Sequence, residues 1–255
     1  MSASTALADG FPGALWIKAA LDLIFPALCP ACGTPLGVGR RDPLCGACWS
    51  GIERIRHLDC PQCGAASFDV TAEPPGPTCL SCRQAPPAFD YARSAAQYRG
   101  PLREALHAFK FRGKRALARV LGDLVVEQWG ASLAGEVLAL VPVPLARDRA
   151  RERGYNQAEL LAARLGIRLD IPVKPRWLRR VKATLPQTDL TAAERRANVR
   201  GAFSASLGVA GQHVVVIDDV FTTGATVDEC ARALRAAGAA RVGVLTVARV
   251  ASATV

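Results

Sequence analysis

The sequence predicts an α/β fold, with a mostly parallel sheet flanked by helices, preceded by a small cysteine-rich module. Eight of the nine cysteines form four Cys-x-x-Cys pairs between residues 29 and 82. Beyond residue 88, apolar runs rich in Val and Leu alternate with amphipathic segments, as strands and helices do in α/β domains. The cysteine-rich part and the α/β part also differ in net charge. Residues 1–83 hold 6 Lys and Arg against 7 Asp and Glu, whereas residues 84–255 hold 26 against 15.

A short amphipathic helix is expected first. In residues 14–25, apolar side chains surround Lys18 and Asp22, and Pro26 ends the pattern. One lysine gives a weaker basic face than a helix at a membrane surface needs, so we expect this helix to pack on the rest of the protein. The chain is thereby divided into an N-terminal helix (1–28), a zinc module (29–83) and an α/β domain (88–255).

The cellular compartment that we expect depends on two features that the sequence lacks, a membrane-spanning segment and a secretory signal. No uninterrupted run of about 18 apolar residues occurs, which argues against a membrane-spanning helix. Residues 1–10 lack the basic start, the apolar core and the cleavage site of a secretory signal. We therefore expect a cytoplasmic protein, in a reducing compartment where such cysteine pairs bind metal rather than form disulfides.

The cysteine pairs predict two structural zinc ions (Zn²⁺). Twelve residues separate Cys32 from Cys45, and fifteen separate Cys63 from Cys79. Each Cys-x-x-Cys can form a turn that brings two sulfurs to one metal, and a site with four thiolates leaves no open position for a substrate. Sequential grouping is preferred over an interleaved one, with the ligands Cys29, Cys32, Cys45 and Cys48 in one site and Cys60, Cys63, Cys79 and Cys82 in the other. His57 is expected to be no ligand, and Cys230 to be a buried small residue.

The α/β domain is expected to contain four strands and four helices. The strands are predicted at 93–98, 137–143, 213–218 and 242–248, and the helices at 101–109, 115–129, 156–165 and 225–237. Asn156 and Gln157 stand where they can cap the third helix.

The most informative stretch is residues 214–226, a buried strand, a loop and the start of a helix. Asp218 and Asp219 end the strand, and Thr222, Thr223 and Gly224 lead into the helix. The carboxylates can accept hydrogen bonds from ribose hydroxyls beside a divalent cation, while loop amides and hydroxyls hold a phosphate. A strand followed by a capped helix explains the threonines but leaves two adjacent, unpaired acids unexplained.

These residues resemble the phosphoribosyl pyrophosphate (PRPP) motif of type I phosphoribosyltransferases, with four apolar residues, two acids, two further residues and Thr-Thr-Gly-x-Thr. From residue 25 onward the chain is similar to the ComF family of competence proteins, which join a double zinc ribbon to a phosphoribosyltransferase domain. The further residues that carry this resemblance are Cys29-Pro-Ala-Cys32-Gly, Tyr98-Arg-Gly-Pro-Leu102, Lys110-Phe-Arg-Gly113, Val141-Pro-Val-Pro144, Arg153-Gly-Tyr-Asn-Gln157, Gln187, Arg195, Arg196 and Asn198.

The resemblance implies a role for each part of the motif. Asp218 and Asp219 are the implied catalytic pair, which holds the ribose hydroxyls of PRPP bound with Mg²⁺. Arg153 and Arg195 offer forks for diphosphate oxygens. Residues 182–198 are the implied mobile loop, and Arg147, Arg149 and Arg151 are expected to be solvated. The implied PRPP-binding set is Asp218, Asp219, Val220, Phe221, Thr222, Thr223, Gly224, Ala225, Thr226, Arg153 and Arg195.

The basic charge suggests a nucleic-acid surface. Residues 93–200 hold 22 Lys and Arg against 10 Asp and Glu, a balance that suits a sugar-phosphate backbone. Aromatic side chains such as Phe109, Phe111, Tyr155 and Trp177 are available for base stacking. The candidate contacts with single-stranded DNA are Lys110, Arg112, Lys114 and Arg115.

Two functions remain open at this point. In the first, the protein binds PRPP and single-stranded DNA and acts in DNA uptake during natural transformation. It then works in the cytoplasm or as a peripheral protein at the inner face of the membrane, with a competence helicase or membrane uptake channel as partner. In the alternative, it is an active phosphoribosyltransferase that moves phosphoribose to an unidentified base or amine acceptor.

Overall fold

A computed structural model describes residues 27–37, 42–65, 78–133, 135–182 and 191–251. The helix expected at 14–25 and the residue Gln187 lie outside these described residues. No helix among the described residues is long and apolar enough to cross a membrane.

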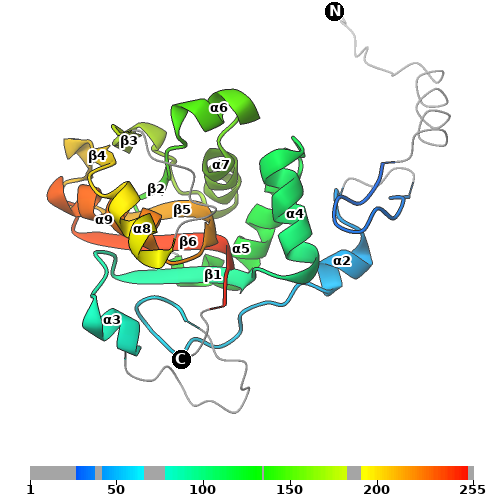
Figure 1. Ribbon diagram of the computed structural model, residues 1–255, viewed down its shortest axis with the longest axis horizontal. Helices are drawn as coiled ribbons and strands as arrows, with labels where there is room; N and C mark the ends of the chain where they lie inside the picture. The colour runs from blue at the N-terminus through cyan, green and yellow to red at the C-terminus, as the bar shows by residue number, and fades with distance from the viewer. Residues whose placement is uncertain (1–26, 38–41, 66–77, 134, 183–190, 252–255) are drawn as a thin grey trace, which may run out of the picture.

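A four-stranded parallel sheet forms the centre of the α/β domain (Figure 1). Its strands are β1 (Tyr91–Gln97), β6 (Arg241–Arg249), β5 (His213–Phe221) and β2 (Ala139–Pro142), in that spatial order. Every neighbouring pair is parallel, which confirms the predicted fold class and all four predicted strands. The two central strands are almost continuous apolar runs, because helices cover both faces of a parallel sheet.

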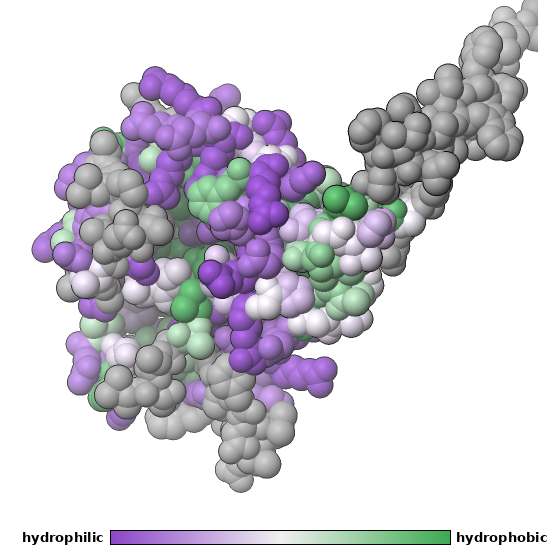
Figure 2. Space-filling model, turned by 45° about the vertical axis from the view of Figure 1, so that its right-hand side comes forward, coloured by the Kyte–Doolittle hydropathy of each residue, from purple (hydrophilic) through white to green (hydrophobic). Residues whose placement is uncertain are grey.

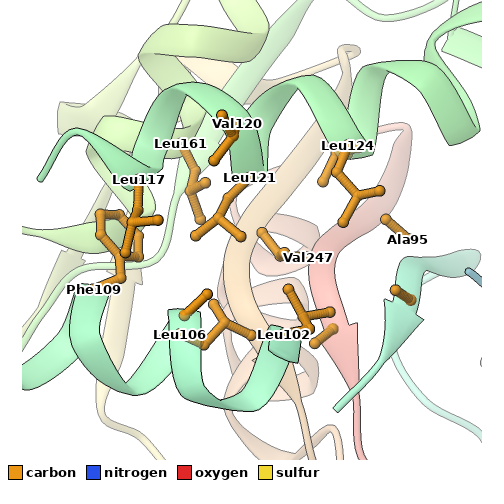
Figure 3. Packing of buried hydrophobic residues seen from close by; sticks show 14 of the residues in the cluster. Ala95, Leu102, Leu106, Phe109, Leu117, Val120, Leu121, Leu124, Leu161 and Val247 are labelled. Atoms are coloured by element: carbon orange, nitrogen blue, oxygen red, sulfur yellow. The ribbon is translucent and has the colours of Figure 1, made fainter. Parts of the chain in front are cut away.

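Alternate residues of the central strands enter two separate cores. Val215 and Leu245 face a core shared with α4 (Gly100–Phe111), α5 (Leu117–Leu133) and α7 (Gln157–Leu169). Val214 and Val244 face the opposite core, which includes α9 (Ala225–Ala236). In Figure 3, Leu102, Leu106 and Phe109 of α4 lie across from Leu117 and Leu121 of α5, with Val247 of β6 behind them. These four helices are the predicted ones, and the Asn156 side chain caps α7 by accepting from the Ala158 amide at 3.0 Å.

Several smaller elements were not predicted. A two-stranded antiparallel sheet, β3 (Leu178–Arg180) and β4 (Phe203–Ala205), packs beside α9. The described part of the implied mobile loop contains α8 (Ala192–Val199). The remaining short elements are α2 (Gly46–Ser50), α3 (Leu80–Gln84), α6 (Arg147–Arg153), η1 (Pro175–Trp177) and η2 (Leu207–Val209).

The cysteine-rich module runs along the outer edge of β1. The Ile55 amide donates to the Ala95 carbonyl at 3.0 Å, and the Ala92 amide donates to the Gln62 carbonyl at 2.7 Å. Gly64 follows the third pair of cysteines, Cys60 and Cys63, with φ +68°, and a Cβ there would lie 2.2 Å from the Ala92 carbonyl oxygen. The module is thus fixed to the sheet by backbone contacts, which only a glycine at position 64 allows.

Gly64→Ala is therefore expected to destabilise the protein far more than Gly33→Ala. Both glycines have positive φ, but no atom lies within 4 Å of a Cβ at Gly33. Strain alone should cost about 1–2 kcal/mol at Gly33, and strain plus displacement from β1 about 3 kcal/mol or more at Gly64. Urea unfolding of the zinc-loaded variants measures both losses in the free energy of unfolding. Equal losses would contradict the close packing of Gly64 against β1.

Candidate functional site

A cavity of about 510 Å³ opens at the carboxyl ends of β2 and β5. Its wall combines the loop after β5 with side chains from α4, α6, α7, β3 and α8. In Figure 2 hydrophilic residues crowd the upper part of the face shown, where α6 lies in Figure 1. In parallel α/β sheets this edge is where ligands bind, because the helices that follow the strands begin there.

The loop after β5 is shaped by a glycine and a threonine. Gly224 has φ +78°, and a Cβ there would lie 2.6 Å from Cζ of Phe221. Thr223 is exposed and is not among the residues that line the cavity, and its Oγ1 accepts from the Ala225 amide at 3.4 Å. Thr222, Gly224 and Ala225 line the cavity, so the N-terminus of α9 meets it with the positive end of the helix dipole.

The two acids lie inside β5, because the strand continues to Phe221 rather than ending at Asp218 as predicted. Burial raises the pKa of Asp218 to about 7, with the neighbouring Asp219 carboxylate adding to the rise and Lys110 opposing it. The Asp219 amide donates to Asp218 Oδ1 at 2.9 Å. Both side chains line the cavity.

The position of Lys110 differs from two expectations, that both acids are unpaired and that Lys110 lies on an outward basic surface. Its Nζ lies 2.8 Å from Asp219 Oδ1, so the acids are not both unpaired, and its side chain is only 21% exposed. Lys110 therefore belongs to the cavity rather than to an outward basic surface. Of the other three proposed DNA contacts, Arg112 pairs with Glu104 at 3.9 Å and Arg115 donates to the Gly154 carbonyl at 3.0 Å. Those two and Lys114 are exposed.

Arginines form the opposite wall. Arg153 Nη1 donates to Gln157 Oε1 at 3.1 Å, and its guanidinium lies 4.8 Å from the centroid of the Phe111 ring. Burial lowers the pKa of Arg153, and the charge of Asp219 opposes that change. Arg195 also lines the cavity, and so does Arg149, which was expected to be solvated.

Little in the sequence indicated that Gln157 and Arg180 would line the cavity. Gln157 is 2% exposed, and its Nε2 donor has no hydrogen-bond partner among the described residues. Arg180 comes from β3, a strand that was not predicted, and burial lowers its pKa. The sequence signal at Gln157 was the Arg153–Gln157 motif, where a helix cap was the competing interpretation.

The eight paired cysteines form two clusters with sequential grouping. Within each cluster the ligand atoms lie within 4.8 Å of one another, and His57 belongs to neither. The Sγ atoms of Cys32 and Cys45 are 3.6 Å apart, and those of Cys63 and Cys79 are 3.7 Å apart. Tetrahedral Zn²⁺ with bonds of about 2.3 Å requires sulfurs about 3.8 Å apart. The donor sets therefore fit two closed structural zinc sites.

Known proteins share both parts of this architecture. Residues 20–84 match the double zinc ribbon domain, and residues 124–255 match the phosphoribosyl transferase domain. The chain is 35% identical over 226 residues to the DNA utilization protein YhgH of Salmonella typhimurium, covering 87% of this chain and 96% of that protein. It is 33% identical over 216 residues to Competence protein F of Haemophilus influenzae, covering 82% and 91%.

A third relative is less similar and is aligned over somewhat less of both chains. Competence protein ComFC of Bacillus subtilis is 28% identical over 205 residues, which cover 78% of this chain and 80% of that protein. Two domain matches in the same order, together with relatives aligned over most of both chains, show the family. The chain belongs to the ComF family, in which a double zinc ribbon precedes a phosphoribosyltransferase domain.

Proposed function

We propose that this protein binds PRPP with Mg²⁺ in the cavity and single-stranded DNA on the adjoining basic surface, and that it acts in DNA uptake. The observation that carries the proposal is the convergence of an acid pair, a helix N-terminus and partly buried arginines on one cavity. PRPP has a matching chemistry, with ribose hydroxyls between a 5′-phosphate and a diphosphate.

The placement of the ligand follows from charge. The 5′-phosphate fits the loop of Thr222 to Thr226, where the helix dipole and backbone amides favour an anion. Asp218 and Asp219 accept from the ribose hydroxyls and lie near Mg²⁺. The diphosphate then faces Arg153 and Arg195, with the buried donor of Gln157 as a further partner.

The DNA surface adjoins the mouth of the cavity. Arg112, Lys114 and Arg115 are exposed where α4 passes into α5. Phe111 is 60% exposed beside them and lines the cavity, so a base can stack on its ring. The relatives named for competence and DNA utilization support this role. A cytoplasmic place near the inner membrane face, beside a helicase or uptake channel, completes the proposal.

Asp219→Asn should weaken PRPP binding at least about tenfold while the fold is kept, because one paired carboxylate of the site is removed. Calorimetric titration of PRPP with Mg²⁺ measures this. Asp123→Asn is the matched control, since Asp123 also pairs with a basic side chain, Arg164, at 2.7 Å but does not line the cavity. Unchanged affinity in Asp219→Asn would remove the assignment.

PRPP affinity should increase as the pH rises from 6 to 8. The pKa of Asp218 in the empty cavity is raised to about 7, and we expect the ligand with Mg²⁺ to prefer the ionised carboxylate. Below pH 7 binding must then release a proton, which weakens it up to about tenfold per pH unit. Asp218→Asn should bind less tightly with a flatter pH profile; a slope equal to that of the wild type would contradict this role.

Arg112→Glu combined with Lys114→Glu should weaken single-stranded DNA binding and leave PRPP binding unchanged. Each phosphate that the variant no longer neutralises lowers the slope of log affinity against log salt by about 0.7. Fluorescence anisotropy at several salt concentrations measures the slope. Lys174→Glu with Arg200→Glu changes the net charge equally at other exposed positions, and an equal effect from that pair would argue against a defined DNA surface.

A further inference from the structure

A buried arginine joins the second cysteine cluster to the sheet. Arg249 ends β6 and is only 6% exposed. Its Nη1 donates to the Cys63 carbonyl at 2.6 Å, and its Nη2 lies 3.7 Å from Cys63 Sγ. A buried guanidinium needs a compensating negative charge, which four thiolates around Zn²⁺ supply in excess of the metal's own charge.

The same guanidinium also supports an aromatic ring of the cavity. Arg249 Cζ lies 4.4 Å from the centroid of the Phe221 ring, and the two residues are register partners at the ends of β6 and β5. Phe221 is 4% exposed, lines the cavity and packs edge-on against Phe89, with centroids 6.2 Å apart. The ring is therefore held between Arg249 and Phe89.

Phe221 in turn supports the phosphate loop. The position that a Cβ would take at Gly224 is 2.6 Å from Cζ of Phe221, so the ring lies directly against the backbone of that residue. A shift of the ring must displace Gly224, and a shift of Gly224 must displace the ring. Contacts thus run without a gap from Cys63 through Arg249 and Phe221 to the loop.

The first cysteine cluster lies in a different environment. Cys29, Cys45 and Cys48 belong to the core on the α4 and α5 face. The second cluster shares its core with Phe221 and Val227. The first cluster is therefore an internal control for any effect that reaches zinc from the loop.

We propose that Arg249 is a positioning residue that couples the second zinc site to the phosphate loop. A phosphorylated ligand that orders the loop then slows zinc loss from Cys60, Cys63, Cys79 and Cys82. The ligand thereby raises the zinc affinity of that site, and zinc in that site raises the ligand affinity by the same factor. The choice of PRPP as ligand rests on the proposed function, but the coupling itself does not.

The first test needs no ligand. Zinc-loaded protein is treated with excess chelator and N-ethylmaleimide, and mass spectrometry follows alkylation of each cysteine. Gly224→Ala pushes on Phe221 and should speed alkylation of the second cluster severalfold, with the first cluster unchanged. Gly211→Ala is the matched control, because it also has positive φ but no atom within 4 Å of a Cβ. No acceleration in Gly224→Ala, or equal acceleration of both clusters, would overturn the coupling.

The second test uses PRPP with Mg²⁺, after calorimetry has shown whether it binds. It should slow alkylation of the second cluster about fivefold or more and leave the first unchanged. Arg249→Met should abolish this protection while the protein still binds two zinc ions. Arg93→Met is the control, since Arg93 donates to the Pro61 carbonyl at 2.8 Å between two ligands of the same site; its protection should persist.

The outcomes separate the two proposals. Absence of PRPP binding contradicts the proposed function, and the glycine pair then decides the coupling alone. Binding with equal protection of both clusters, or with protection that persists in Arg249→Met, contradicts the coupling. Should Arg249→Met fail to fold, Phe221→Leu interrupts the same series of contacts. It is expected to remove the protection at PRPP concentrations that calorimetry shows to saturate this variant.

Discussion

The parallel pairing of β5 with β6 is the constraint on which the rest of the structure depends. It extends from His213↔Arg241 to Phe221↔Arg249, the full length of both strands. Because side chains alternate along the pair, one set of residues fills the core under α4, α5 and α7, and the other fills the core under α9. The same pairing carries the two acids to the carboxyl edge of the sheet, beside the start of α9.

The cavity is assembled from charges that balance one another across long sequence distances. Lys110 of α4 meets Asp219 of β5, and the charge of Asp219 also acts on Arg153 of α6. Lys110 and Arg153 are only partly buried. Each could therefore replace its interaction with Asp219 by one with a phosphate at a modest cost in desolvation. The groups that we propose to hold the ligand therefore neutralise part of one another's charge while the cavity is empty.

The sequence predicted the parts of the fold whose pattern is local. Strands such as 213–218 are apolar runs, the major helices are periodic, and the cysteine spacing alone predicted the two clusters that are observed. The misses have physical causes. β3 and β4 are three residues each, too short for any period to show.

Side-chain partners were harder to predict than elements. The pairing of Lys110 with Asp219 joins residues 109 positions apart, so only the folded chain brings them together. The place of Arg180 in the cavity could not be predicted either, because the sequence did not reveal β3, the strand that carries it. The acid pair and the glycine loop were predictable, since residues 218–226 are contiguous and their chemistry is contained in one motif.

Both open edges of the sheet are covered by segments of the same chain. Leu140 of β2 exchanges backbone hydrogen bonds with Pro172 and Lys174, and β1 does so with residues 53–62 of the cysteine-rich module. An uncovered parallel edge presents unpaired amides and carbonyls that can recruit a strand from another molecule. Zinc bound by the cysteine clusters would hold the turns that cover β1, so we expect a chain made without enough metal to leave this edge open to pairing with another chain.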